Sequence, residues 1–104
     1  LLPLMRLLYE NNVDLVLAGH DHLYERFHPL TPEQVPDPAK GLRLFTVGTG
    51  GRDLYTFPRV LPNSAVRDNQ NFGLLRITMK EAAYDWSFVN IGGIVIDSGS
   101  GVCF

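Results

Sequence analysis

Two histidines separated by a single residue are the part of this sequence best suited to chemistry. His20 and His22 follow the apolar run at residues 13–18, with Gly19 between the run and the first histidine. In an extended chain alternate side chains point to the same face, so we expect both imidazoles to point one way and Asp21 the other. Imidazole is the commonest metal ligand in proteins. The pattern therefore predicts half of a metal site.

The elements before the histidines should position them. Residues 13–18 are short and apolar, which predicts a buried strand in a sheet that is covered on both faces. Residues 4–12 carry leucines and a methionine at helical spacing, which predicts an amphipathic helix packed on that sheet. Open α/β sheets usually bind ligands beyond the carboxyl ends of their strands. The histidines would then lie at the edge where such sites occur.

Three further strands are predicted downstream, at residues 41–48, 72–79 and 83–89. The last two are joined by Lys80 and Glu81, which suit a hairpin turn. Tyr84, Trp86 and Phe88 share one face of the last strand, and we interpret them as sheet-packing residues rather than a platform for a nucleobase.

The intervening segments read as loops. Four prolines predict an irregular loop over residues 27–40, and residues 52–70 are polar and predict a second exposed loop. The glycines of the stretch 48–51 predict a tight turn after the second strand. Residues 91–104 contain only a short apolar run followed by serine and glycine.

Composition excludes several classes of protein. The chain has 104 residues, of which 45% are hydrophobic and 19% charged, as in a globular domain. A net charge of −2 offers no basic surface for nucleic acid or anionic lipid, so neither nucleic acid nor a membrane is an expected partner. No apolar stretch approaches the roughly 20 residues that span a bilayer. Cys103 is alone, which excludes an internal disulfide and favours an inert buried thiol.

Residues 19–26, Gly-His-Asp-His-Leu-Tyr-Glu-Arg, resemble the last metal-binding motif of the calcineurin-like metallophosphoesterases. The Tyr-Glu-Arg extension is similar to the purple acid phosphatase branch, in which a Gly-Thr-Gly-Gly stretch also follows the next strand. The resemblance implies an α/β fold, namely the C-terminal portion of an αββα sandwich with one N-terminal helix and then mostly strands. Residues 1–104 would be the C-terminal fragment of a single catalytic domain.

The resemblance also implies a dinuclear centre of two divalent or trivalent ions, such as iron, zinc or manganese. His20 would bind one ion and His22 the other, which makes both catalytic residues. The substrate would be a phosphate ester, as in an acid phosphatase acting on phosphomonoesters. The family's other ligand motifs lie N-terminal to this one and do not occur in this chain. We therefore expect the chain to begin inside a longer protein and to be inactive in isolation.

Four neighbours of the histidines are candidate substrate or supporting residues: Tyr24, Glu25, Arg26 and His28. Tyr24 could border the site, while Glu25 and Arg26 could orient a ligand imidazole or, for Arg26, bind phosphate. For Glu25 and Arg26 we favour the alternative of a structural ion pair. For His28 we favour an ordinary loop histidine over a substrate-side acid.

Three other functions stay open from the sequence. A phosphodiesterase of the same superfamily would use the same metal ligands. A non-catalytic interaction module could retain the fold. His20, His22 and His28 could instead hold one structural zinc ion. The oligomeric state and the compartment also stay open, although the resemblance favours a secreted or periplasmic location with any signal peptide upstream.

Overall fold

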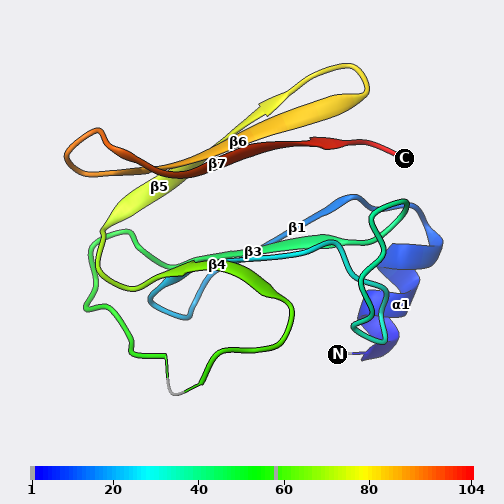
Figure 1. Cartoon of the computed structure of the whole chain (residues 1–104), viewed down its shortest axis with the longest axis horizontal. Coiled ribbons are helices and arrows are strands. Elements are labelled where there is room, and N and C mark those ends of the chain that lie inside the picture. Colours follow the sequence, from blue (N-terminus) through cyan, green and yellow to red (C-terminus); the bar gives the residue numbers. More distant parts are fainter. Residues whose placement is uncertain (1, 58) are drawn as a thin grey trace.

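The computed structural model describes residues 2–57 and 59–104, which form one helix and two β-sheets (Figure 1). In chain order the elements are α1 (Leu2–Glu10), β1 (Leu15–Ala18), β2 (Tyr24–Phe27), β3 (Arg43–Val47), β4 (Ser64–Asp68), β5 (Gly73–Met79), β6 (Ala83–Asn90) and β7 (Val95–Val102). The predicted α/β class, with a helix followed mostly by strands, is confirmed. Within these residues no helix is long and apolar enough to cross a membrane.

The first sheet has the strand order β1-β3-β2-β4. β1 and β3 run parallel, with Leu15 opposite Arg43 and Ala18 opposite Thr46. β2 is antiparallel to both β3 and β4. The carboxyl ends of β1 and β3 therefore meet at one edge of the sheet, and the short segment that contains the histidines joins β1 to β2 at that edge.

The second sheet is an antiparallel meander in the order β5-β6-β7, and Figure 1 shows it stacked over the first sheet. Gly99 and Gly101 of β7 lie opposite Trp86 and Tyr84 of β6. A Cβ atom at either glycine would collide with the aromatic ring opposite it. The rings thus cover the backbone of β7, so a serine- and glycine-rich segment forms a strand that its own side chains do not indicate.

An aromatic core joins the two sheets. Tyr24 and Phe45 come from the first sheet, and Tyr84, Trp86 and Phe88 come from the second. Tyr24 stacks on Phe88 with 4.1 Å between the ring centroids, and Phe45 meets Trp86 edge-on at 5.5 Å. Such pairs add roughly 0.5–1.5 kcal/mol each to the gain from burial. The prediction that the aromatic residues of β6 pack the sheet is confirmed.

A carboxylate from β7 is also buried between the sheets. Asp97 accepts hydrogen bonds from the Tyr24 hydroxyl at 2.6 Å and from Arg26 Nε and Nη2 at 2.8 and 3.2 Å. The Asp97 and Arg26 side chains are only 8% and 14% exposed. Burial alone would raise the pKa of Asp97, but the hydrogen bonds from Arg26 and Tyr24 outweigh it and hold the pKa below its ordinary value. An ionised aspartate therefore ties β2 to the second sheet.

We expected the first sheet to be covered on both faces and the helix to pack on it. Within the described residues this prediction is wrong. Helix α1 begins two residues earlier than predicted and has no buried residue. It is held to the loop after β2 by polar contacts, among them a hydrogen bond of 2.7 Å from the Tyr9 hydroxyl to Asp37. β1 lies at the edge of its sheet, where Leu17 is 59% exposed. The apolar residues of both elements thus have little to pack against within this part of the chain.

Two strands of the first sheet were not predicted. β2 and β4 lie in segments expected to be the metal motif and an exposed loop, and their sequences are Tyr-Glu-Arg-Phe and Ser-Ala-Val-Arg-Asp. Both pair along their length with a neighbouring strand. Pairing with distant partners therefore overrides weak local propensity. Cys103, expected to be buried, is partly buried against the aromatic core.

Candidate metal centre

The segment between β1 and β2 is a bend rather than an extended chain. His20 has a φ of +77°, in the left-handed region that residues other than glycine rarely adopt. The Leu23 amide donates to the Asp21 carbonyl at 2.8 Å, which tightens the chain again just before β2. Because the backbone is not extended, the predicted alternation of His20 and His22 against Asp21 does not apply. A strained backbone conformation is frequent at functional sites, where it costs about 1–3 kcal/mol.

Gly48, the residue after β3, supports this histidine loop (residues 19–23). Its amide donates to the Leu23 carbonyl at 2.9 Å. A Cβ atom at Gly48 would overlap the Asp21 carbonyl oxygen and press on the backbone of His22. The loop thus lies directly on the end of β3, and only glycine leaves room for it.

Alanine at Gly48 should therefore displace the histidine loop, whereas alanine at Gly50 should not. Apart from the two residues adjacent to Gly50 in the chain, no heavy atom of the described residues lies within 4 Å of a Cβ built there, which makes Gly50→Ala a matched control. We expect Gly48→Ala to lower the free energy of unfolding by about 1–3 kcal/mol, as overpacking does. Urea unfolding followed by fluorescence of Trp86, the single tryptophan, measures this. Equal stability of the two variants would contradict the proposed contact.

The ring of His22 is fixed by the loop that follows β3. Its Nδ1 lies 2.7 Å from the Asp53 carbonyl oxygen, and the Tyr55 ring stacks on it with 4.3 Å between centroids and 28° between planes. A carbonyl can only accept, so in the neutral imidazole Nδ1 carries the proton and Nε2 keeps its lone pair. Metal-binding histidines commonly donate their second nitrogen to a carbonyl in this way. His22 therefore fits a metal ligand that binds through Nε2.

His20 is exposed, and in residues 2–57 and 59–104 no hydrogen bond to its ring is formed. Over the same residues no three histidine, cysteine, aspartate or glutamate side chains lie close enough together to hold a metal ion. The alternative of one zinc ion held by His20, His22 and His28 is therefore wrong. The two neighbouring histidines fit part of a donor set, and the rest of the set is not among the described residues.

The other predicted site residues lie elsewhere. Tyr24 directly follows the histidine loop and is fully buried in the aromatic core, where its hydroxyl donates to Asp97. Arg26 pairs with Asp97, so the favoured structural ion pair is present, although its carboxylate comes from β7 instead of Glu25.

Glu25 and His28 are also held apart from the histidine loop. Glu25 accepts a hydrogen bond of 2.5 Å from the Ser64 hydroxyl of β4. His28 is exposed and follows the far end of β2, where its amide donates to the Asn63 carbonyl at 3.1 Å. The residues that do contact His22, namely Asp53 and Tyr55, were not predicted, since only the length of their loop marks it in the sequence.

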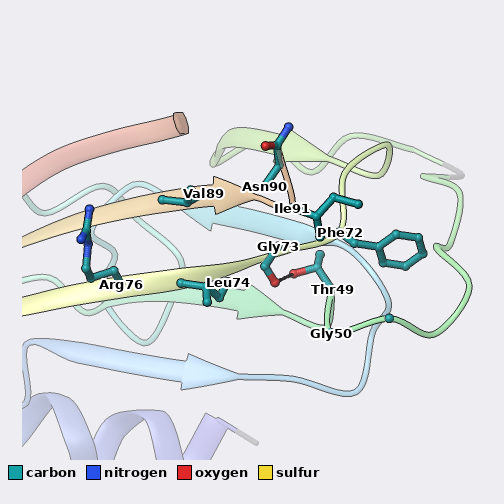
Figure 2. Close-up of a pocket in the computed structure, with 10 residues that line it drawn as sticks. Thr49, Gly50, Phe72, Gly73, Leu74, Arg76, Val89, Asn90 and Ile91 are labelled. Carbon is teal, nitrogen blue, oxygen red and sulfur yellow. Dashed lines mark hydrogen bonds between the residues drawn. The ribbon is translucent and has the colours of Figure 1, made fainter. Parts of the chain in front are cut away.

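A hollow whose lining includes none of residues 19–23 is a separate feature (Figure 2). It lies where β3 ends and β5 begins, and the Thr49 hydroxyl donates to the Gly73 carbonyl across it at 2.9 Å. Its lining is mostly apolar and contains no histidine: Thr49, Gly50, Gly51, Phe72, Gly73, Leu74, Arg76, Val89, Asn90 and Ile91. The hollow thus adds no histidine, cysteine or carboxylate to the two histidines already described.

Comparison with known proteins agrees with the motif, although no family model matches the sequence. A segment of 45 residues, 43% of this chain, is 49% identical to Purple acid phosphatase 21 of Arabidopsis thaliana and covers 10% of that protein. The purple acid phosphatase PPD1 from yellow lupin (Lupinus luteus) seeds superimposes with a TM-score of 0.83 and 26% identity, over 93% of this chain and 19% of that chain.

A third protein shares the fold. GAP50, described as the anchor in the inner membrane complex of Plasmodium, superimposes with a TM-score of 0.78 at 20% identity, over 97% of this chain and 29% of that one. The chain thus spans less than a third of the length of each relative. In motif and in fold, this chain is similar to the C-terminal part of the purple acid phosphatases.

Proposed function

We propose that this chain is the C-terminal part of the catalytic domain of a metal-dependent phosphoesterase. His20 and His22 would each supply an imidazole to one ion of a dinuclear centre. The proposal rests on the hydrogen bond between His22 Nδ1 and the Asp53 carbonyl. This bond leaves the lone pair of Nε2 to bind a metal ion. The similarity to two purple acid phosphatases supports it.

The chemistry suits the residues that the chain provides. When bound, a pair of iron, zinc or manganese ions neutralises the charge of the phosphate group and lowers the pKa of the attacking water. Neutral imidazoles hold such ions without cancelling the positive charge on which that activation depends. Each ion needs about four or more donors, so the remaining ligands would come from polypeptide outside these 104 residues.

The substrate is proposed to be a phosphomonoester, since the two phosphatase relatives are described as acid phosphatases. A phosphodiesterase could use the same ligands, because loops rather than metal ligands select the leaving group. Parallel assays with p-nitrophenyl phosphate and bis(p-nitrophenyl) phosphate separate the two substrates.

A non-catalytic interaction module is the second candidate. GAP50 shares the fold and is described as an anchor, so the fold alone does not decide between enzyme and module. The retained pair His20 and His22 favours the enzyme, because a module that binds no metal needs neither imidazole. In the full-length protein, loss of the family's ligand motifs that lie N-terminal to this one would favour the module.

The test is to graft residues 2–104 into the lupin enzyme in place of the structurally equivalent segment, using the observed superposition. We expect the purified graft to hydrolyse p-nitrophenyl phosphate, because the lupin portion would supply the missing ligands. The 104-residue chain alone should be inactive. A folded, metal-loaded graft without activity, beside an active parent enzyme, would contradict the proposal.

A further inference from the structure

The loop between β3 and β4 contacts the histidine loop at Gly48 and again, through Asp53 and Tyr55, at His22. From the contact at His22 we infer that Tyr55 is a positioning residue for His22, which keeps the imidazole in the tautomer with the proton on Nδ1. The inference rests on the proposed function, in which Nε2 of His22 binds a metal ion. Tyr55 would act through His22 without touching the substrate.

Three contacts join the segment 53–55 to His22, one to its backbone and two to its ring. The Asp53 carbonyl lies 2.7 Å from Nδ1, and the Tyr55 amide donates to the His22 carbonyl at 2.7 Å. The Tyr55 ring covers one face of the imidazole, with 4.3 Å between centroids. The hydrogen bond selects which nitrogen carries the proton, and the stacked ring opposes the rotation that would break this bond. Together they set the tautomer and the direction of Nε2.

Tyr55 is itself anchored from the other side. Its carbonyl accepts a hydrogen bond of 2.9 Å from the Asn69 carboxamide, which follows β4. The segment is thus held between the histidine loop and the first sheet. The Asp53 carboxylate plays no part, because it points to an exposed ion pair with Arg52 at 3.3 Å. The backbone of Asp53 and the side chain of Tyr55 carry the interaction.

Packing alone does not account for this tyrosine. Tyr55 is 40% exposed and lies outside the aromatic core. Over residues 2–57 and 59–104 its hydroxyl makes no hydrogen bond, so the ring provides the contact. Phenylalanine should therefore replace Tyr55 without loss, and alanine should not.

The test uses the ¹⁵N-labelled 104-residue chain at a pH well above the ordinary histidine pKa of about 6.5. Long-range ¹H–¹⁵N correlation reports which nitrogen of each imidazole is protonated. We expect His22 to carry its proton on Nδ1 in the native chain and in Tyr55→Phe. In Tyr55→Ala it should show the mixed tautomers of a free imidazole, as exposed His28 should in every variant.

Asn69→Ala provides a second variant, since it removes the anchor of Tyr55 and leaves both rings intact. It should shift His22 in the same direction as Tyr55→Ala, and native Trp86 fluorescence verifies that each variant is folded. In the grafted enzyme Tyr55→Ala should lower kcat about 10–100-fold, the usual cost of losing a residue that orients a metal ligand. Tyr55→Phe should restore it.

Three results would overturn the inference. The first two are a proton on Nε2 of His22 in the native chain and an unchanged tautomer in a folded Tyr55→Ala variant. An active graft that tolerates Tyr55→Ala at full kcat would also overturn it. The tautomer is measured without metal or substrate. An inactive graft would therefore count against the proposed function, while the tautomer of His22 would still decide the role of Tyr55.

Discussion

Alanine at His22 should reduce the kcat of the grafted enzyme by more than about 100-fold, because losing a residue that merely orients a ligand already costs about 10–100-fold. Under the proposed function, the substitution removes the nitrogen that binds one ion. The ring is half-buried and lies in a loop rather than in the aromatic core, so the folded structure should survive. Steady-state kinetics with p-nitrophenyl phosphate and metal analysis of the purified variant measure the effect.

His28→Ala is the matched control for this prediction. His28 is exposed and lies beyond the opposite end of β2, so its loss should leave kcat unchanged. His20→Ala should behave like the His22 variant, because the proposal gives each histidine its own ion. Near-normal turnover in either variant, with the metal content retained, would remove that residue from the mechanism.

Alanine at Asp97 should destabilise the 104-residue chain by about 3–5 kcal/mol, the usual cost of breaking a buried ion pair. The substitution leaves the Arg26 guanidinium between the sheets without its carboxylate, and the Tyr24 hydroxyl loses its acceptor. A loss of this size is a large part of the total stability of a small domain. Urea unfolding followed by Trp86 fluorescence gives the difference.

Asp85→Ala supplies the comparison. Asp85 also lies in the second sheet and pairs with Lys80 at 2.7 Å, but its side chain is 40% exposed and water screens the pair. Its loss should change stability little. The effect of Asp97→Ala should also depend on pH. Because the folded pKa of Asp97 is lowered, its contribution is present above the ordinary value of about 3.9 and is lost as the pH falls through the folded value.

The difference in the free energy of unfolding between the native chain and Asp97→Ala should therefore become smaller in acid. If the difference stays constant well below a pH of about 3.9, with both chains still folded, the charge of Asp97 contributes nothing to stability. A loss no larger than that of Asp85→Ala would contradict the role of the buried ion pair.

The sequence predicts the helix and those strands whose own residues form an apolar or aromatic pattern. The helix and the strands β1, β3, β5 and β6 lie within a few residues of their predicted positions. β2, β4 and β7 could not be found this way, because pairing and cross-strand rings stabilise them. Gly99 and Gly101, for example, form a strand only because Trp86 and Tyr84 lie against them.

The candidate site, too, can be predicted only in part from the sequence. The spacing of His20 and His22 is visible in the sequence, and so is the family motif around them. The shape of their loop is not visible in the sequence, because it depends on the close approach of Gly48, the residue that follows β3. The contact between His22 and Tyr55 is formed by residues 33 positions apart in an irregular loop, which no local pattern indicates.

The ion pair of Asp97 has a consequence for folding during synthesis. Asp97 is 73 positions after Tyr24, its hydrogen-bond partner just beyond the histidines. A chain emerging from the ribosome would expose β2 and its half of the aromatic core until β6 and β7 have been translated. Such distant contacts close slowly. The segment that follows the histidines can therefore reach its native geometry only late, after β7 has been translated.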